Sequence, residues 1–141
     1  MMTEKVVTVL PETSIVDAVK ILIKNNFHGL PVVEKNNVLV GIFTEYDLMP
    51  TVQNVVQNLS AFGEGSSEFR NGIRTVKNLR VKDVMNKEPL TFLDNANFDE
   101  VIKTFREHHR VNPIPVIDSQ KKLVGVVSRF DVVKLFDLLG A

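Results

Sequence analysis

The sequence contains no cysteine and no tryptophan among its 141 residues. Without cysteine there can be no disulfide framework, no thiolate nucleophile and no cysteine-ligated zinc or iron–sulfur centre. Long apolar runs are also missing, because stretches such as residues 38–43 fall far short of the roughly 20 residues that span a bilayer. No signal peptide is visible, since Glu4 and Lys5 interrupt the first apolar pieces. These absences predict a soluble, cytoplasmic protein that has no membrane partner.

Net charge is absent as well, because 17 basic side chains balance 17 acidic ones. A neutral chain with one tyrosine and no tryptophan offers little charge or stacking surface to a nucleic acid, which is therefore not an expected partner. The balance hides an asymmetry between the two halves of the chain. Residues 1–69 hold 4 basic and 8 acidic side chains, a net of −4, whereas residues 70–141 hold 13 and 9, a net of +4.

A sequence repeat is the most informative feature that is present. Residues 30–34 (LPVVE) correspond to residues 114–118 (IPVID), and residues 39–47 (LVGIFTEYD) correspond to residues 123–131 (LVGVVSRFD), both at an offset of 84. Residues 7–10 (VTVL) match residues 90–93 (LTFL) at an offset of 83. Such self-similarity indicates two copies of one structural unit that pack together into a single core.

Each copy predicts the same order of elements: strand, helix, strand, strand, helix. The predicted strands are residues 6–10, 30–33 and 38–43 in the first copy and residues 89–93, 114–117 and 123–127 in the second. Ser14 and Asn97 each stand three residues before an acid, a capping-box pattern that marks the start of the first helix in each copy. The second helices begin at Glu45 and Arg129. The fold class is therefore predicted as α/β (α+β), built from two β-α-β-β-α repeats.

One motif recurs where a buried strand passes into a helix, at residues 41–47 and 125–131. In a structural interpretation, Thr44 with Asp47 and Ser128 with Asp131 form capping boxes that satisfy backbone N–H groups at the helix start. A functional interpretation uses the same geometry, because a hydroxyl at a helix N-terminus can bind phosphate and a carboxylate one turn later can accept from ribose hydroxyls. The spacing alone leaves both interpretations open.

Two such copies, each with a hydrophobic-Pro-Val-hydrophobic strand and a Gly-x-x-Thr/Ser-x-x-Asp turn, resemble a tandem pair of CBS domains, or Bateman module. The resemblance divides the chain into repeat 1 at residues 1–60, a linker at 61–80 and repeat 2 at 81–141. It implies that the repeats pack through their sheets about a pseudo-two-fold axis and leave two clefts between them. Such clefts commonly bind AMP, ADP, ATP or S-adenosylmethionine as regulatory ligands, with no obligatory cofactor.

The resemblance also implies a role for individual residues. Asp47 and Asp131 would bind ribose hydroxyls, and Thr44 and Ser128 would bind phosphate. Backbone groups at the strand starts would bind the adenine edge, and residues of the first strand of each copy would line the clefts; these are Gly29, Leu30, Pro31, Asn112, Ile114 and Pro115, and Thr8, Val9, Thr91 and Phe92.

The sequence departs from many AMP-sensing members in the residues before the Pro-containing strand. Those members carry His-Arg there, whereas this chain has His28-Gly29 and Asn112-Pro113. His28 can therefore be interpreted as a phosphate contact or as an ordinary histidine at a strand edge. His108 and His109 are expected to be exposed histidines at a helix end rather than metal ligands.

Local charge distinguishes the two repeated turns. Arg129 follows Ser128, whereas Glu45 follows Thr44. A phosphate beside Ser128 would therefore have a favourable neighbour. If one cleft binds a phosphorylated ligand better, we expect it to be the cleft built around Ser128 and Asp131.

The main alternative to ligand sensing is a ligand-independent interaction module. The last helix is apolar enough to serve both the core and a partner, with a homodimer as the expected assembly and an unidentified effector protein as a further partner; its apolar residues are Val132, Val133, Leu135, Phe136, Leu138 and Leu139. An enzyme is not expected, because the sequence has no metal-ligand cluster, Walker loop, nucleophile elbow or catalytic cysteine.

Overall fold

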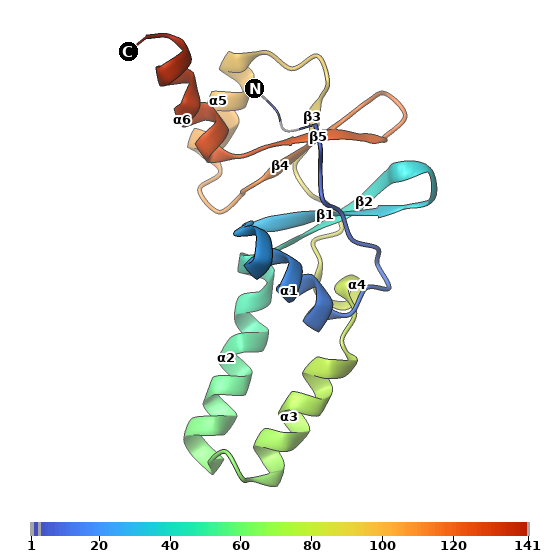
Figure 1. Ribbon diagram of the computed structural model, residues 1–141, viewed down its shortest axis with the longest axis vertical. Helices are drawn as coiled ribbons and strands as arrows, with labels where there is room; N and C mark the ends of the chain where they lie inside the picture. Colours follow the sequence, from blue (N-terminus) through green and yellow to red (C-terminus); the bar gives the residue numbers. More distant parts are fainter. Residues whose placement is uncertain (1, 3, 141) are drawn as a thin grey trace.

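Two small sheets, one from each half of the chain, lie next to one another in the computed structural model, which describes residues 2 and 4–140 (Figure 1). The elements of the first half are α1 (Ile15–Asn25), β1 (Gly29–Glu34), the 3-10 turn η1 (Lys35–Asn37), β2 (Val38–Thr44), α2 (Glu45–Phe62) and α3 (Ser67–Asn78). Those of the second half are α4 (Val81–Val84), β3 (Phe92–Leu93), α5 (Phe98–Glu107), β4 (Ile114–Ile117), β5 (Leu123–Val127) and α6 (Arg129–Leu138). This order confirms the mixed helix and strand class.

Both sheets contain the same antiparallel pair. β1 pairs with β2 so that Gly29 lies opposite Thr44, and β4 pairs with β5 so that Ile114 lies opposite Val127. Each ladder shifts its register once, at equivalent points of the two repeats. The strands predicted at residues 114–117 and 123–127 are confirmed residue for residue.

The first strand of each copy is shorter than the sequence predicts. In the second copy only Phe92 and Leu93 pair with β4, and in the first copy the strand expected at residues 6–10 is reduced to a bridge between Val9 and Val32. Val9 donates to the Pro31 carbonyl at 3.1 Å and accepts from the Val33 N–H at 3.0 Å. Toward the N-terminus, the next hydrogen bond of this parallel pairing would need an N–H at Pro31. Proline has no N–H, so the pairing ends there.

The helix starts that the sequence predicts are present. The Ser14 side chain accepts from the backbone N–H of Asp17, and the Asn97 side chain accepts from that of Glu100. Within the expected linker, α3 folds back beside α2 and also contacts α1, so that a helical hairpin extends away from the sheets (Figure 1). Among the described residues, no helix has both the length and the apolarity that crossing a membrane requires.

Each half of the chain contributes a segment to the core of the other half. Val81 is completely buried in the core of the first half, against Val9 and Ile15, and its N–H donates to the Thr13 carbonyl at 2.8 Å. Met2 in turn packs against the core of the second half, which contains Phe92. On the surface, the Lys82 ammonium donates to Glu12 at 2.9 Å, and this carboxylate raises the pKa of Lys82.

A third apolar cluster joins the two sheets. It contains Val33 and Leu39 from the first repeat and Ile117 and Leu123, their equivalents, from the second. Around it, the N–H of Leu39 donates to the Lys121 carbonyl at 3.0 Å, and Ile42 exchanges two backbone hydrogen bonds with Asn86, at 3.0 and 2.9 Å. These contacts confirm that the repeats pack through their sheets.

Gly41 of the first repeat lies against Met85 and Asn86 of the second, and its replacement tests this packing. A Cβ atom at Gly41 would stand 2.8 Å from the Asn86 carbonyl oxygen and 2.9 Å from the Met85 sulfur. We therefore expect Gly41→Ala to lower the free energy of unfolding by about 1–3 kcal/mol in urea denaturation. Gly65→Ala is the matched control, because nothing lies within 4 Å of that position. Equal stability of the two variants would contradict this account of Gly41.

Candidate functional site

The two repeated turns form capping boxes at the starts of α2 and α6. Asp47 Oδ2 accepts from the Thr44 N–H and from the Thr44 hydroxyl, both at 2.9 Å, while the Asp47 N–H donates to Thr44 Oγ1 at 3.3 Å. Asp131 Oδ2 accepts from the Ser128 N–H at 2.8 Å, and the Asp131 N–H donates to Ser128 Oγ at 3.1 Å. The structural interpretation of the motif is therefore confirmed.

Capping leaves part of each motif available to a ligand. Every hydrogen bond of these boxes to a carboxylate uses Oδ2, and the Oδ1 atoms of Asp47 and Asp131 accept none from the described residues. The Thr44 hydroxyl already donates to Asp47, whereas the Ser128 hydroxyl donates to no group in the described part of the chain. Capping and ligand binding can thus occur in the same turn, and the Ser128 hydroxyl is available to donate a hydrogen bond to a ligand.

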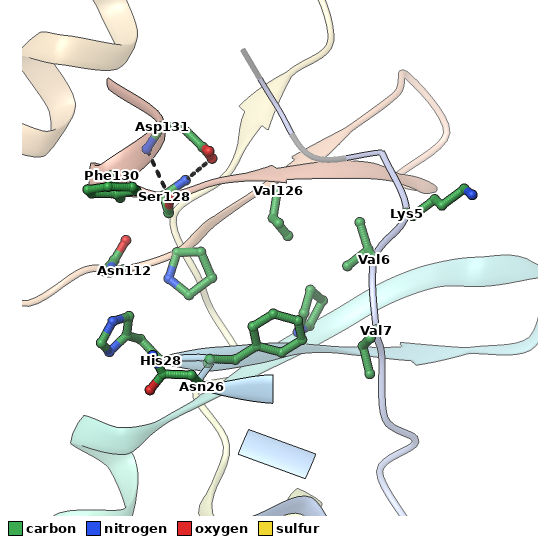
Figure 2. Close-up of a pocket in the computed structure, with 14 residues that line it drawn as sticks. Lys5, Val6, Val7, Asn26, His28, Asn112, Val126, Ser128, Phe130 and Asp131 are labelled. Atoms are coloured by element: carbon green, nitrogen blue, oxygen red, sulfur yellow. Dashed lines mark hydrogen bonds between the residues drawn. The ribbon is translucent and has the colours of Figure 1, made fainter. Parts of the chain in front are cut away.

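A cavity of about 420 Å³, here called cleft 1, lies between the repeats beside Ser128 and Asp131 (Figure 2). Its size falls within the roughly 300–1,000 Å³ of typical small-molecule sites. It joins the start of α6 to the residues before β1 and to a segment near the N-terminus. The lining residues are Lys5, Val6, Val7, Asn26, Phe27, His28, Gly29, Pro31, Asn112, Pro113, Val126, Ser128, Phe130 and Asp131.

A smaller cavity of about 230 Å³, here called cleft 2, repeats this arrangement with the two halves exchanged. It joins Thr44 and Asp47 at the start of α2 to the residues before β4 and to residues 88–90, the equivalents of residues 5–7. The lining residues are Ile42, Thr44, Tyr46, Asp47, Asn86, Glu88, Pro89, Leu90, Arg110, Val111, Asn112 and Pro113. Each cleft therefore combines the turn of one repeat with the strand start of the other.

The structure brings together most of the predicted site residues. Cleft 1 contains Ser128, Asp131, His28, Gly29, Pro31 and Asn112, and cleft 2 contains Thr44, Asp47 and Asn112. The side chains of Leu30 and Ile114 are buried in the cores of their own repeats, and Pro115 is also fully buried.

Four residues that the resemblance places along the clefts line neither of them. Val9 and Phe92 are buried in the two cores, and Thr8 and Thr91 are also absent from the cleft walls. The lining residues lie earlier in the chain, at residues 5–7 and 88–90. The physical reason is that the short ladder at Val9 and Phe92 holds these side chains in the cores, so the clefts begin only where the pairing has ended.

Three aromatic lining residues were not predicted, and one of them is Phe27 in cleft 1. Phe130 lines cleft 1 and Tyr46 lines cleft 2. Phe130 and Tyr46 occupy the aromatic position directly before the acid of the repeated motif. That repeated aromatic position is a signal in the sequence that could have identified them.

Arg129 does not lie in cleft 1, contrary to the prediction from its place in the sequence. Its guanidinium donates to the carbonyls of Phe105, at 2.8 Å, and His108, and lies 5.0 Å from the centre of the Phe105 ring. The carbonyls at the end of α5 lack partners within their own helix, and they attract this donor. Arg110 lines cleft 2 instead, with its guanidinium 5.1 Å from the centre of the Tyr46 ring.

His28 lies at the edge of cleft 1, on the opposite side from Ser128 (Figure 2). Its Nδ1 atom is 3.2 Å from Glu45 Oε1, and the two side chains are 56% and 61% exposed. Such an exposed pair contributes little to stability, so the imidazole can turn toward a ligand at small cost. Within the described residues, no group of three His, Asp or Glu side chains could hold a metal ion.

Comparison with known sequences identifies relatives along nearly the whole chain. Residues 1–54 and 81–137 match the family model of the CBS domain. The chain is 28% identical over 135 residues to the chloroplastic CBS domain-containing protein CBSX2 of Arabidopsis thaliana. The match spans 89% of this chain but only 56% of the plant protein. It is 30% identical over 135 residues to a CBS domain-containing protein of Dictyostelium discoideum, covering 96% of this chain and 87% of that protein.

Solved structures agree with these matches. A crystal structure of CBSX2 in complex with AMP superposes with a TM-score of 0.77 at 29% identity and covers 99% of this chain and 95% of that one. The CBS domain pair of protein MJ0100, in complex with methylthioadenosine and S-adenosyl-L-methionine, gives a TM-score of 0.71 at 25% identity and covers 96% and 94%. With both repeats matched and the same paired fold, the chain belongs to the CBS domain family as a tandem CBS pair.

Proposed function

We propose that this chain is a regulatory module that binds an adenosyl ligand in the clefts between its two CBS repeats, foremost in cleft 1. The observation that carries the proposal is the capping box at Ser128 and Asp131, which leaves a hydroxyl donor and a carboxylate oxygen available beside a cavity of about 420 Å³. The complexes of CBSX2 with AMP and of the MJ0100 pair with methylthioadenosine and S-adenosyl-L-methionine support the class of ligand.

The walls of cleft 1 suit the three parts of such a ligand. Val6, Val7 and Val126 provide an apolar surface for an adenine ring. The free oxygen of Asp131 would accept from the ribose hydroxyls, and the Ser128 hydroxyl at the start of α6 would donate to a phosphate. Backbone groups near Gly29 and Asn112 are the proposed partners of the adenine edge.

Cleft 1 is the proposed site of tighter binding, although Arg129 does not provide the favourable charge that the sequence predicted there. Arg129 donates to the carbonyl of Phe105 at the end of α5 and does not line cleft 1. The preference now rests on the larger volume of cleft 1, about 420 Å³ against about 230 Å³, and on the available hydroxyl of Ser128. The Thr44 hydroxyl of cleft 2 would first have to leave Asp47.

The proposed output is regulatory rather than catalytic. A ligand in either cleft touches both repeats, so it favours whichever packing of the repeats binds it better. We also propose an effector protein that binds one packing of the repeats in preference to another. The proposed location is cytoplasmic, and the proposed repeats are residues 1–60 and 81–141.

Self-association is a second candidate function, and the surface of α6 favours it. Five apolar side chains of α6 and its end are mostly exposed: Val133 at 56%, Phe130 at 64%, Phe136 at 69%, and Leu138 and Leu139 at 79% each. Exposed apolar side chains that form a patch commonly mark a protein–protein contact. The proposed partner is a second copy of this chain.

Substitution of Asp131 tests the ligand proposal. We expect Asp131→Asn to weaken AMP binding by more than about tenfold in isothermal titration calorimetry, because the ribose loses a charged acceptor while an amide oxygen can still cap α6. Asp47→Asn should weaken binding less. Asp137→Asn is the matched control on α6, since Asp137 lines neither cleft. Loss of AMP binding in Asp47→Asn alone would contradict the preference for cleft 1, and absence of heat with every adenosyl ligand would contradict the function.

Replacement of an exposed apolar residue on α6 tests self-association. We expect wild-type protein to have the mass of a dimer in light scattering, and Phe136→Glu to have the mass of a monomer because it puts a charge into the apolar contact. Val56→Glu is the matched control, since Val56 is also exposed, at 52%, but lies on α2. A monomeric wild-type protein, or equal dissociation of both variants, would refute a dimer formed through α6.

A further inference from the structure

A groove of about 420 Å³, here called the helical groove, lies among α1, α2 and α3. α1 lies near the end of the helical hairpin that is closer to the sheets, and it contacts α3 (Figure 1). Nine of the eleven side chains that line the groove are valine, isoleucine or leucine, and the other two are Lys20 on α1 and Thr51 on α2. None of these residues lines cleft 1 or cleft 2, so the groove is separate from both.

The hairpin consists of only two helices, so part of its apolar surface is left uncovered by the described chain. Toward the tip the helices lie close together, because a Cβ atom at Gly72 would stand 3.1 Å from the side-chain nitrogen of Asn58. Nearer α1 the groove lies between them, and Val52 and Val56 are 43% and 52% exposed there. Aliphatic surface in a concave site is stabilised when an apolar group displaces water from it.

The aliphatic walls of the groove favour a hydrocarbon chain. They include no aromatic ring on which a base could stack and, apart from Lys20 and Thr51, no polar side chain. A nucleoside or an extended peptide would bury hydroxyl or amide groups there without partners, which costs free energy. An unbranched hydrocarbon chain has no polar group to desolvate, and each methylene that it buries strengthens binding by about fourfold.

The two polar side chains of the groove indicate the head group of such a ligand. Both can donate a hydrogen bond, and no acidic side chain lines the groove. Lys20 takes part in neither ion pair of the described residues. The Thr75 and Thr104 hydroxyls donate to a carbonyl one turn earlier, whereas the Thr51 hydroxyl makes no hydrogen bond within the described chain. An ammonium and a hydroxyl of this kind are complementary to a carboxylate.

We propose that the helical groove binds a fatty acid, with the hydrocarbon chain along the aliphatic walls and the carboxylate at Lys20 and Thr51. This site goes beyond the proposed adenosyl-binding function and does not depend on it, because the groove and the clefts share no lining residue. The groove gives the chain a second binding site, for a chemically unrelated class of ligand.

Calorimetric titration of the full-length chain with octanoate, decanoate and dodecanoate, each below its critical micelle concentration, tests the inference. We expect each added methylene to strengthen binding by about two- to fourfold, because the groove is open on one side and buries only part of the chain. Dodecyltrimethylammonium has the same tail and a cationic head, and it should bind at least about fourfold more weakly than dodecanoate since Lys20 repels it.

Two variants with matched controls locate the site. Lys20→Gln should weaken dodecanoate binding by about two- to fivefold and should not weaken dodecyltrimethylammonium binding. Lys24→Gln is its control, because this lysine is one turn further along α1 and lines neither the groove nor the clefts. Val52→Phe should weaken dodecanoate binding by about tenfold, because its ring occupies the groove. Val133→Phe is its control, since Val133 is also exposed but lies on α6.

The possible results decide on the fatty-acid site independently of the proposed function. Absence of dodecanoate binding to wild-type protein would overturn it, and so would equal binding by all four variants, because the chain would then bind elsewhere. Loss of a wild-type dimer in Val52→Phe without dodecanoate binding would assign the groove to a second copy and would also overturn it. AMP should bind Lys20→Gln and Val52→Phe as it binds wild type. Absence of AMP binding to wild type would contradict the adenosyl-binding function alone, and dodecanoate binding with the expected variant effects would still support the groove.

Discussion

Neither half of this chain can bury its sheet without the other half, and the rest of the structure depends on that constraint. β1 and β2 form a sheet of only two strands, and an isolated two-stranded hairpin is marginally stable in water. Contact between the two sheets buries this surface, because Val33 and Leu39 pack in one apolar cluster with their equivalents Ile117 and Leu123. This cluster belongs equally to both repeats. Val81 also links the two halves, because it comes from the start of the second half and is buried in the core of the first.

The clefts follow from this shared core. Because the repeats meet through their sheets, the turn that ends β5 faces the residues that precede β1, and the turn that ends β2 faces the residues that precede β4. A ligand in either position contacts both repeats. Binding of the proposed ligand would therefore be coupled to how the repeats pack, which is the physical requirement for a regulatory module.

The repeated turn shows how one motif can serve structure and function together. A carboxylate has two oxygens, and the cap at the start of each helix engages Oδ2 of Asp47 or Asp131. The other oxygen is left for a ligand without cost to the helix. The arginines show a similar division, because Arg129 donates to the carbonyls at the end of α5, whereas Arg110 lines cleft 2.

The sequence by itself determined the features that depend on neighbours along the chain. The repeat, the strands around Pro31 and Pro115 and the capping boxes at Thr44 and Ser128 could be predicted because their hydrogen bonds and apolar periodicity are local. Only the tertiary structure decided which turn faces which strand start, that the clefts begin before Val9 and Phe92, and that Arg129 turns toward Phe105. Each of these depends on contacts between residues far apart in sequence, whose geometry is set by how the two sheets pack and not by the spacing of residues along the chain.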